Sequence, residues 1–318
     1  MIKMPIPCRR CGSADAEVYI PYARLSLCPE CFRDFYVKRI KRTVEEFRMF
    51  RIDDRVGVAV SGGKDSTALL HGLKEAFPNM EFVALHVDLG IEGYSEECRE
   101  KVEKLTEVLD VELEVYDLKE ELGFTIDDFK RTIYRRKICS ACGTVKRHIF
   151  EVLAGRVGVK VLATGHNLDD IVGIMLNNFF SGNWSQLVRL RPVLEPVEPN
   201  QTLKVKPLIT TPEDENLLYC LYSDLPFREE NCPHAHKERI SRNREILEFL
   251  SKRNPNFRHQ MLRNFLKLIP ILEEAIEKPK YRRCRICGYP SSSDVCAFCR
   301  RVELVRKAKG MNIKTEKA

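Results

Sequence analysis

A short stretch at residues 61–66 has the residue types and spacing of a phosphate-binding loop. It reads Ser-Gly-Gly-Lys-Asp-Ser and follows an apolar run. Glycines let backbone N–H groups approach a ligand, and the N-terminus of a following helix attracts anions. Lys64 adds a positive charge, and Asp65 adds a carboxylate that can help to hold a metal ion. Two common phosphate motifs do not fit, because Val58 and Asp65 stand at required positions of G-x-x-x-x-G-K-[ST] and G-x-G-x-x-G is absent.

Two further polar stretches lie where apolar segments end. Asp88 closes one segment, and Thr-Gly-His-Asn-Leu-Asp-Asp at residues 164–170 closes another. In open parallel sheets, ligands bind beyond the carboxyl ends of the strands. Paired carboxylates beside phosphates are natural Mg²⁺ ligands, so Asp169 and Asp170 are candidates. The structural alternative is that one of these two aspartates caps the following helix.

Thirteen cysteines are present, and ten of them fall in five C-x-x-C pairs. Since the N-terminus carries no apolar signal segment, we expect a reducing cytoplasm, where such pairs hold metal more often than they form disulfides. The first two and the last two pairs predict two closed structural Zn²⁺ sites of four thiolates each. The ligands would be Cys8, Cys11, Cys28 and Cys31 at one end and Cys284, Cys287, Cys296 and Cys299 at the other.

Cys139, Cys142 and Cys232 lie outside these two fingers, in polar surroundings. Three thiolates could hold a third zinc ion, with His234 or His236 as the fourth ligand. They could also provide a persulfide-carrying cysteine with a resolving partner, or hold a [4Fe–4S] cluster with one iron free of protein ligands. From the residues alone, these alternatives stay open.

The elements that must position these residues alternate between strands and helices. Amphipathic helical patterns separate four short apolar segments, which predict strands at 55–61, 81–88, 113–118 and 159–166. This alternation indicates an α/β fold with a doubly wound parallel sheet. Cys98 and Cys220 fall in helical patterns, and we expect both to pack in the core. Residues 191–212 contain five prolines and predict a loop with one edge strand.

Four parts are expected along the chain. They are an N-terminal zinc finger with a connecting helix (1–50), an α/β domain that carries the phosphate loop (51–220), a helical region (221–279), and a C-terminal zinc finger with a basic tail (280–318). The connecting helix has an apolar stripe and a basic opposite face, which we expect to be solvated.

Positive charge is concentrated toward the C-terminus. The chain has a net charge of +7, whereas residues 237–318 contain 21 Lys and Arg against 9 Asp and Glu. This asymmetry predicts that a polyanion binds the C-terminal quarter. No apolar run approaches the roughly 20 residues of a membrane span, so no membrane partner is expected.

The combination of motifs resembles a known family. Ser-Gly-Gly-Lys-Asp-Ser after a strand is similar to the loop of the PP-loop (N-type) ATP pyrophosphatases. The whole combination of motifs resembles the tRNA 2-thiouridine synthetases. Besides the loop, it comprises the 164–170 stretch, C-x-x-C-G-x-x-K-R at Cys139, the cysteine of Glu-Glu-Asn-Cys-Pro-His-Ala and the zinc knuckles at both ends. The resemblance covers nearly the whole chain. It departs from the family pattern at Ile171, where an acidic residue is expected.

The resemblance implies a function and a set of site residues. ATP would activate O2 of a uridine or ribothymidine in tRNA by adenylation, with release of pyrophosphate, and sulfur would replace that oxygen. Binding of ATP with Mg²⁺ would fall to Ser61, Gly62, Gly63, Lys64, Asp65, Ser66, Asp88, Gly165 and His166. The catalytic residues would be Lys146, Asp169, Asp170 and the cysteines that hold the [4Fe–4S] cluster, Cys139, Cys142 and Cys232.

The resemblance also implies partners. Family members form homodimers and take sulfur from a ubiquitin-like carrier with a C-terminal thiocarboxylate. Arg239, Arg242 and Arg244, with the C-terminal finger and tail, would hold tRNA phosphates. The target is the wobble uridine or the T-loop ribothymidine, and the stretch after Cys142 favours the T loop.

Two alternatives remain at this point. One is another PP-loop adenylating enzyme, of the amidation or lysidine-forming type, which needs no cysteine triad. The other is a zinc-finger RNA-binding protein with a vestigial ATP site, which the intact residues 61–66 argue against.

Overall fold

A six-stranded sheet lies at the centre of the molecule. The computed structural model describes residues 6–12, 15–198, 201–235, 237–277 and 280–311. The strand order is β5-β4-β3-β6-β8-β7, and every neighbouring pair is parallel except β7 with β8. The strands are β3 (Val56–Ala59), β4 (Phe82–Asp88), β5 (Glu112–Asp117), β6 (Val161–Ala163), β7 (Val193–Leu194) and β8 (Leu203–Val205). The expected doubly wound parallel sheet is confirmed.

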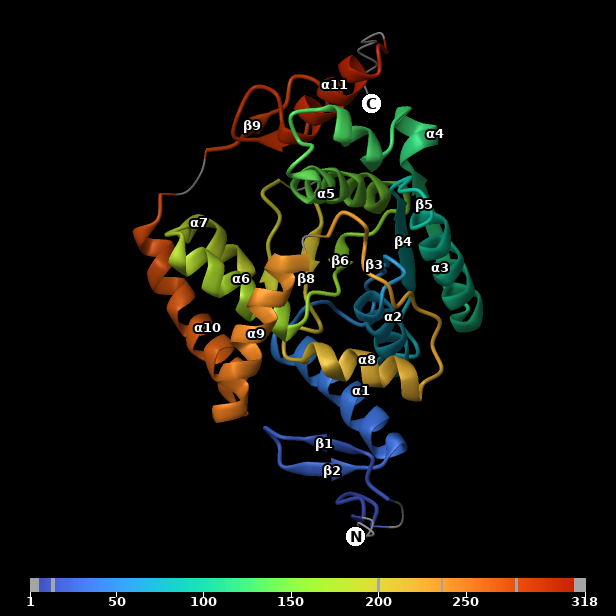
Figure 1. Cartoon of the computed structure of the whole chain (residues 1–318), viewed down its shortest axis with the longest axis vertical. Helices are drawn as coiled ribbons and strands as arrows, with labels where there is room; N and C mark the ends of the chain where they lie inside the picture. Colours follow the sequence, from blue (N-terminus) through green and yellow to red (C-terminus); the bar gives the residue numbers. More distant parts are fainter. Residues whose placement is uncertain (1–5, 13–14, 199–200, 236, 278–279, 312–318) are drawn as a thin grey trace.

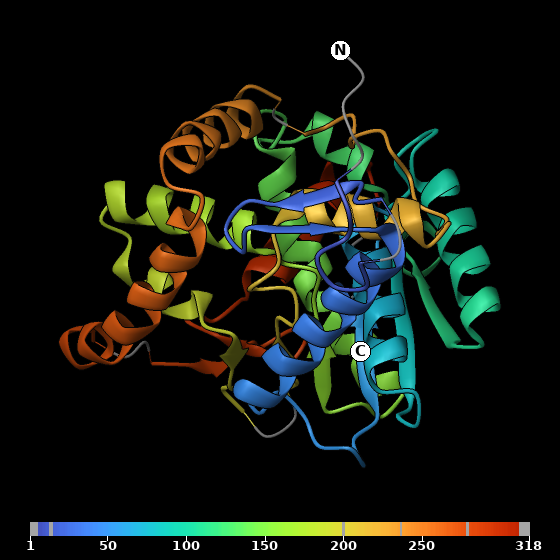
Figure 2. The same ribbon diagram turned by 90° about the horizontal axis from the view of Figure 1, so that it is seen from below.

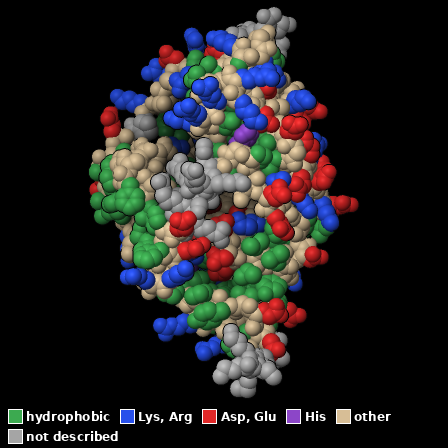
Figure 3. Space-filling model, viewed as in Figure 1, with side chains coloured by type: hydrophobic (Ala, Val, Ile, Leu, Met, Phe, Trp, Pro, Cys, Tyr) green, Lys and Arg blue, Asp and Glu red, His purple; other side chains and the backbone are tan. Residues whose placement is uncertain are grey.

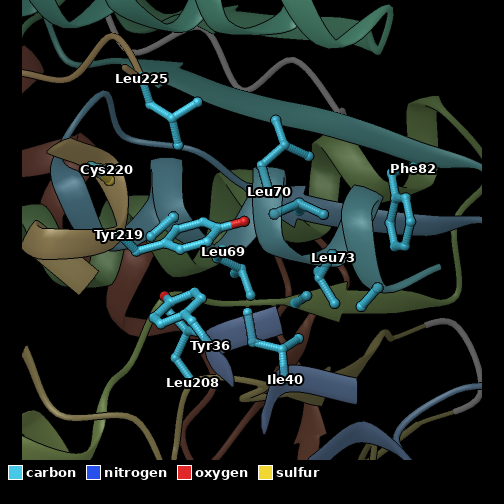
Figure 4. Close-up of a cluster of buried hydrophobic side chains, with 14 of the residues drawn as sticks. Tyr36, Ile40, Leu69, Leu70, Leu73, Phe82, Leu208, Tyr219, Cys220 and Leu225 are labelled. Carbon is cyan, nitrogen blue, oxygen red and sulfur yellow. The ribbon is translucent and has the colours of Figure 1, made fainter. Parts of the chain in front are cut away.

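One face of the sheet is covered by helices from both halves of the chain. They are α1 (Pro29–Glu46), α2 (Lys64–Ala76), α3 (Ser95–Leu109) and α8 (Glu213–Tyr222). In this layer Tyr36 of α1 stacks on Tyr219 of α8, with ring centroids 3.9 Å apart (Figure 4). Their hydroxyls reach Asn216 and His71, both at 2.7 Å. The connecting helix α1 is thereby part of the same apolar core as the sheet.

The opposite face is covered by the centre and the end of the chain. Its elements are α4 (Leu118–Leu122), η1 (Ile126–Arg131), α5 (Ile138–Arg156) and α11 (Ala297–Ala308). Val302 and Val305 of α11 are buried in the same apolar cluster as α5. The C-terminal finger, with β9 (Arg282–Arg283) and β10 (Pro290–Ser291), therefore docks on this layer.

The N-terminal finger lies at the other end of the molecule (Figure 1). It contains the hairpin of β1 (Val18–Ile20) and β2 (Leu25–Leu27) and leads into α1. Viewed from that end, the hairpin crosses in front of α8 (Figure 2).

A third apolar cluster lies beside the sheet. It joins α6 (Leu168–Phe180), α7 (Trp184–Leu187), η2 (Val188–Leu190), α9 (Lys237–Arg253) and α10 (Phe257–Ala275). Residues 191–212 depart from the expectation of one edge strand. They supply both β7 and β8, because the chain turns back on itself and β8 pairs in parallel with β6.

Packing agrees with the expected burial of Cys98 and Cys220, which are 3% and 0% exposed. The four-part division of the chain stays a prediction. Within the part of the chain that the structure describes, no helix combines the length and apolarity that a bilayer crossing requires.

Candidate functional site

The loop at residues 61–66 leads from β3 into the N-terminus of α2. Gly62 has φ +81°, and a Cβ there would lie 2.7 Å from the carbonyl oxygen of Cys98, so only glycine fits without movement. Ser66 Oγ accepts the Ser61 N–H and donates to the Gly63 carbonyl, each at 3.0 Å. Gly63 is the N-cap of α2. The first N–H groups of this helix, which no side chain caps, are a ready site for phosphate.

Two acidic side chains hold the lysine of this loop. Lys64 Nζ lies 3.0 Å from Asp65 Oδ2 and 2.7 Å from Glu213 Oε1. Burial alone would lower the pKa of Lys64, but Asp65 and Glu213 outweigh it and raise the pKa. Asp65 Oδ1 also accepts N–H bonds from Asn167 (3.1 Å) and Asn216 (2.7 Å). Lys64 and Asp65 are thus fixed by residues from two other parts of the chain, the start of α6 and α8.

The stretch at 164–170 follows β6 and packs against the loop. A Cβ on Gly165 would lie 3.2 Å from the backbone of Asp65 and Ser66, so the two segments are in close contact. Asn167 is the N-cap of α6 and accepts the Asp170 N–H at 2.9 Å, while Asp170 reciprocates in a capping box. Desolvation, reinforced by the Asp65 carboxylate, raises the pKa of Asp170 to about 7. Two carboxyl groups that disfavour each other's charge suit a cation between them.

Asp169 has a different set of partners. Its carboxylate accepts the Glu213 N–H at 2.8 Å and lies 2.9 Å from Arg258 Nε of α10. Burial raises the pKa of Asp169, against the opposing effect of Arg258. Asp169 therefore joins α6 to α8 and α10. The helix α6 is capped by Asn167, so the expectation that Asp169 or Asp170 is itself the cap is only partly met, by Asp170 in the capping box.

Three cations act on His166, and none of them forms an ion pair with an acidic side chain of the described residues. Desolvation and the nearby Lys206, Lys146 and Arg147 lower the pKa of His166 to about 4. Lys206, directly after β8, is 8% exposed and donates to the Arg191 carbonyl at 2.6 Å. Burial, with other cations around it, lowers the pKa of Lys206 to about 8. A buried cation of this kind favours an anionic ligand.

The three separate cysteines lie around the N-terminus of α5. Cys139 and Cys142 are in its first turns, and Cys139 Sγ donates to the His234 carbonyl at 2.9 Å. Burial raises the pKa of Cys142, and the neighbouring Cys232 and Cys139 raise it further, whereas Lys146 opposes the rise. The charge of Lys146 also lowers the pKa of His166, so it acts on both the cysteines and the 164–170 stretch.

The segment that carries Cys232 is tied to the phosphate loop. The Arg228 N–H donates to the Gly62 carbonyl at 2.8 Å. Cys232 also acts on Cys98, whose backbone contacts Gly62. The phosphate loop, the cysteines and the 164–170 stretch are therefore brought together at one edge of the sheet.

A third zinc ion at these cysteines receives no support from the geometry. His234 Nε2 bonds Asp127 Oδ1 at 2.6 Å, and the thiols of Cys139, Cys142 and Cys232 are not among the convergent metal-binding groups of the described residues. His236 lies outside the described residues. Cys thiolates are also the ligands of iron–sulfur clusters, so the cluster alternative stays open.

Both terminal fingers bring their four thiols together. The four sulfur atoms of each group lie within 4.8 Å of one another. Individual separations are 3.9 Å for Cys11–Cys28 and 3.7 Å for Cys287–Cys296. Four thiolates about 2.3 Å from one Zn²⁺ would be about 3.8 Å apart in a tetrahedron, so the two groups have the size of structural zinc sites.

Other predicted residues lie farther from this assembly or cannot be placed. Asp88 ends β4 as expected, but its carboxylate accepts the Gly90 N–H at 3.0 Å and shapes the turn there. The side chains of Arg239, Arg242 and Arg244 are outside the described part of the structure.

Sequence reasoning missed Lys206, Glu213, Asn216 and Arg258. A usable signal existed for Lys206, which follows a strand and precedes a proline, as the residues at 164–170 follow β6. The other three act from α8 and α10, whose approach to the loop is a tertiary feature without a local motif.

Two family models match the chain. The PP-loop domain model matches residues 36–250, and the model of the N-terminal LIM domain of 2-thiouridine synthetase TtuA matches residues 8–33. Together they include the N-terminal finger, the phosphate loop and Cys232.

Similar proteins span nearly the full length. The tRNA-5-methyluridine(54) 2-sulfurtransferase of Pyrococcus horikoshii is 36% identical, with 92% of each chain covered. The protein of the same name from Thermus thermophilus is 37% identical, covering 95% of this chain and 93% of its own. Among solved structures, the U34-tRNA thiolase NcsA of Methanococcus maripaludis, described with its [4Fe-4S] cluster, superposes with a TM-score of 0.80 at 29% identity. That match covers 100% of this chain and 99% of the other.

Proposed function

The chain belongs to the PP-loop tRNA 2-thiolation sulfurtransferases, and from this membership we propose that it replaces O2 of 5-methyluridine 54 in tRNA by sulfur. The observation that supports this most is that the segment of Cys232 joins the phosphate loop to the cysteines, through the Arg228 N–H bond to the Gly62 carbonyl and the Cys139 bond to the His234 carbonyl. Position 54 is favoured because the relatives named for it are 36% and 37% identical, whereas the U34 thiolase is 29% identical.

ATP is proposed to bind across the N-terminus of α2. Backbone N–H groups of residues 62–66 would receive the terminal phosphates, and Lys64 would turn from Glu213 toward them. Lys206 would face the remaining negative charge with its buried ammonium, and the neutral ring of His166 could donate a hydrogen bond to the nucleotide. The donor set of Asp65 and Asp170 fits Mg²⁺, which would relieve the repulsion between these carboxylates.

The reaction is proposed to have two stages that balance in oxygen and phosphorus. O2 of the uridine attacks the α-phosphorus of ATP and pyrophosphate leaves, so the base carries AMP on O2. A sulfur nucleophile then attacks C2, and AMP departs with the former O2. Lys146, beside Cys142 and His166, is in a position to stabilise negative charge that develops on the base or the leaving group.

The three thiols fit an iron–sulfur cluster by their chemistry, since thiolates are its usual protein ligands. Cys139, Cys142 and Cys232 would hold it, with Cys142 kept from solvent by the layer under α5. A [4Fe–4S] cluster with three protein ligands supplies an open iron position at which external sulfur can bind. The His234–Asp127 bond fixes the segment of Cys232 against η1, and so holds the third ligand in place.

The remaining features of the family are proposed on the same basis. Zn²⁺ would occupy both four-cysteine groups. The chain would act in the cytoplasm as a homodimer and accept sulfur from a ubiquitin-like thiocarboxylate carrier.

Nucleoside mass spectrometry tests the proposal. Unmodified and 5-methyluridine-containing tRNA would be incubated without oxygen with the iron-loaded protein, Mg²⁺, sulfide and either ATP or no nucleotide. We expect an exchange of sulfur for oxygen at position 54 that depends on ATP and is lost in Cys139→Ser. ATP turnover to AMP without sulfur incorporation would favour an amidating or lysidine-type enzyme, and tRNA binding without turnover would favour an RNA-binding protein.

A further inference from the structure

A groove of about 690 Å³ lies between the N-terminal finger, α1 and α10. It is separate from the site described above, and its lining includes residues from four parts of the chain. Its walls carry six cations against one acid, Glu46. The cations are Arg9, Arg10, Lys38, Arg39, Arg42 and Arg263.

Half of these cations lack an acidic partner. Arg10 and Lys38 share Asp34, and Arg39 pairs with the buried Glu215 at 2.8 Å. Arg9, Arg42 and Arg263 are exposed, and no residue in the described ranges forms an ion pair or hydrogen bond with their guanidinium groups. Figure 3 shows Lys and Arg side chains at the lower left of this face, on the side of the N-terminal finger. The groove therefore keeps a positive charge that its own framework does not neutralise.

Aromatic rings are placed among these charges. Tyr22 of the finger contacts His259 of α10, with ring centroids 4.3 Å apart. Arg39 lies over the Phe35 ring at 4.6 Å. Desolvation and the cations around it, Arg39 first, lower the pKa of His259 to about 4, so its ring is neutral at pH 7. Partly exposed rings between guanidinium groups are the usual surface for nucleic acid, where cations meet phosphates and rings meet bases.

The groove is mechanically coupled to the reaction site. His259 Nε2 contacts the Thr210 carbonyl at 3.1 Å, and the neighbouring Arg258 forms an ion pair with Asp169. The Leu168 N–H, at the start of α6, donates to the Thr211 carbonyl at 2.9 Å. A ligand that binds in the groove would therefore be held at a fixed position relative to Asp169 and Asp170.

We infer that this groove binds the phosphodiester backbone of tRNA next to the reacting nucleotide. The inference rests on the proposed function, which makes tRNA the polyanion that the protein must hold. It adds a binding surface formed by the N-terminal finger, α1 and α10, whereas the net charge along the sequence points to the C-terminal quarter alone. The basic face of α1 is accordingly a binding wall and not merely a solvated surface.

The test compares two charge-matched double variants. Arg42→Glu with Arg263→Glu alters the groove, and Lys104→Glu with Lys160→Glu makes the same change in net charge at exposed positions of other elements. Binding of fluorescently labelled tRNA would be measured by anisotropy over a range of salt concentrations, beside ATP binding and thiolation kinetics. We expect the groove variant to bind tRNA at least about tenfold more weakly. The milder Arg42→Gln with Arg263→Gln should reduce the salt slope by about 1.4, for two phosphate contacts of about 0.7 each.

Each outcome decides the inference. It holds if the groove variant raises the KM for tRNA, keeps kcat and ATP binding, and the control variant behaves as wild type. It is overturned if tRNA affinity and salt slope stay at the wild-type values, or if the control loses as much affinity. If the Glu variant loses ATP binding through misfolding, the Gln variant decides by the same criteria. Unchanged tRNA binding with impaired use of a protein sulfur donor would assign the groove to a protein and overturn the inference. A wild-type enzyme that neither binds nor thiolates tRNA would instead refute the proposed function.

Discussion

Replacing Lys206 by Met should stabilise the protein and abolish its activity. The Lys206 ammonium is buried, and its pKa is lowered from 10.5 to about 8 by desolvation and neighbouring cations. At pH 7 this shift costs the folded state about 3 kcal/mol, at about 1.36 kcal/mol per unit. Met removes that cost and also the bond to the Arg191 carbonyl, which for a charged donor is worth about 1.5–3 kcal/mol. The net expectation is a stabilisation of about 1 kcal/mol.

The pH dependence of the difference in unfolding free energy between wild type and Lys206→Met is a more specific test. Because the folded-state pKa is lower than the unfolded one, the unfolded chain binds more protons between pH 8 and 10.5, and stability rises with pH there. Wild type should therefore gain about 2 kcal/mol relative to Lys206→Met between pH 7 and 9.5. Denaturant unfolding of both proteins at each pH measures the difference, and Lys206→Arg serves as the control that keeps the charge. If the difference in unfolding free energy between the two proteins does not change with pH, Lys206 is not a buried cation with a lowered pKa, and its proposed role in binding an anion is refuted.

Three other predictions follow from single contacts. Gly62→Ala should destabilise the protein by about 1–3 kcal/mol and weaken ATP binding, because φ is +81° and the new Cβ meets the Cys98 carbonyl. Calorimetry with and without ATP measures both effects. An unchanged ATP affinity would contradict this prediction. Cys142→Ser should lose iron and thiolation but keep the zinc of both fingers, whereas Cys220→Ser should keep all metals; elemental analysis decides, and loss of zinc in Cys142→Ser would count against separate sites. His148 stacks on Phe298 of the C-terminal finger, and burial lowers the pKa of His148 to about 4. The free energy of unfolding should therefore fall by about 2–3 kcal/mol as pH drops from 6.5 to 4. An equally steep fall of the unfolding free energy with pH in His148→Phe would refute this.

The sheet and the phosphate loop could be predicted from the sequence because their signals are local. Apolar runs ending in polar stretches mark β3, β4 and β6, and the motif at 61–66 needs only its own residues and the helix after it. The cysteine knuckles are similarly local, and both sets of thiols converge as expected.

The remaining features depend on contacts between distant segments. Nothing in the local sequence indicates that Glu213 reaches Lys64 or that Arg258 reaches Asp169. The reversal that pairs β8 with β6 brings Lys206 to the site, whereas the sequence predicts only one edge strand in this proline-rich segment. Summing charge along the chain also missed the groove, because its cations come from the finger, α1 and α10 and gather only in three dimensions.

The proposed reaction requires that O2 of the tRNA uridine is adenylated before sulfur replaces it. Isotope transfer examines this order, with tRNA that carries ¹⁸O at O2 of the target base. After a thiolation reaction with unlabelled ATP in unlabelled water, mass spectrometry of the nucleotide products follows the oxygen. If O2 is adenylated first, we expect one ¹⁸O in AMP for each sulfur incorporated. Sulfur incorporation with unlabelled AMP would contradict it, since the oxygen would then have left the base without passing to the α-phosphorus.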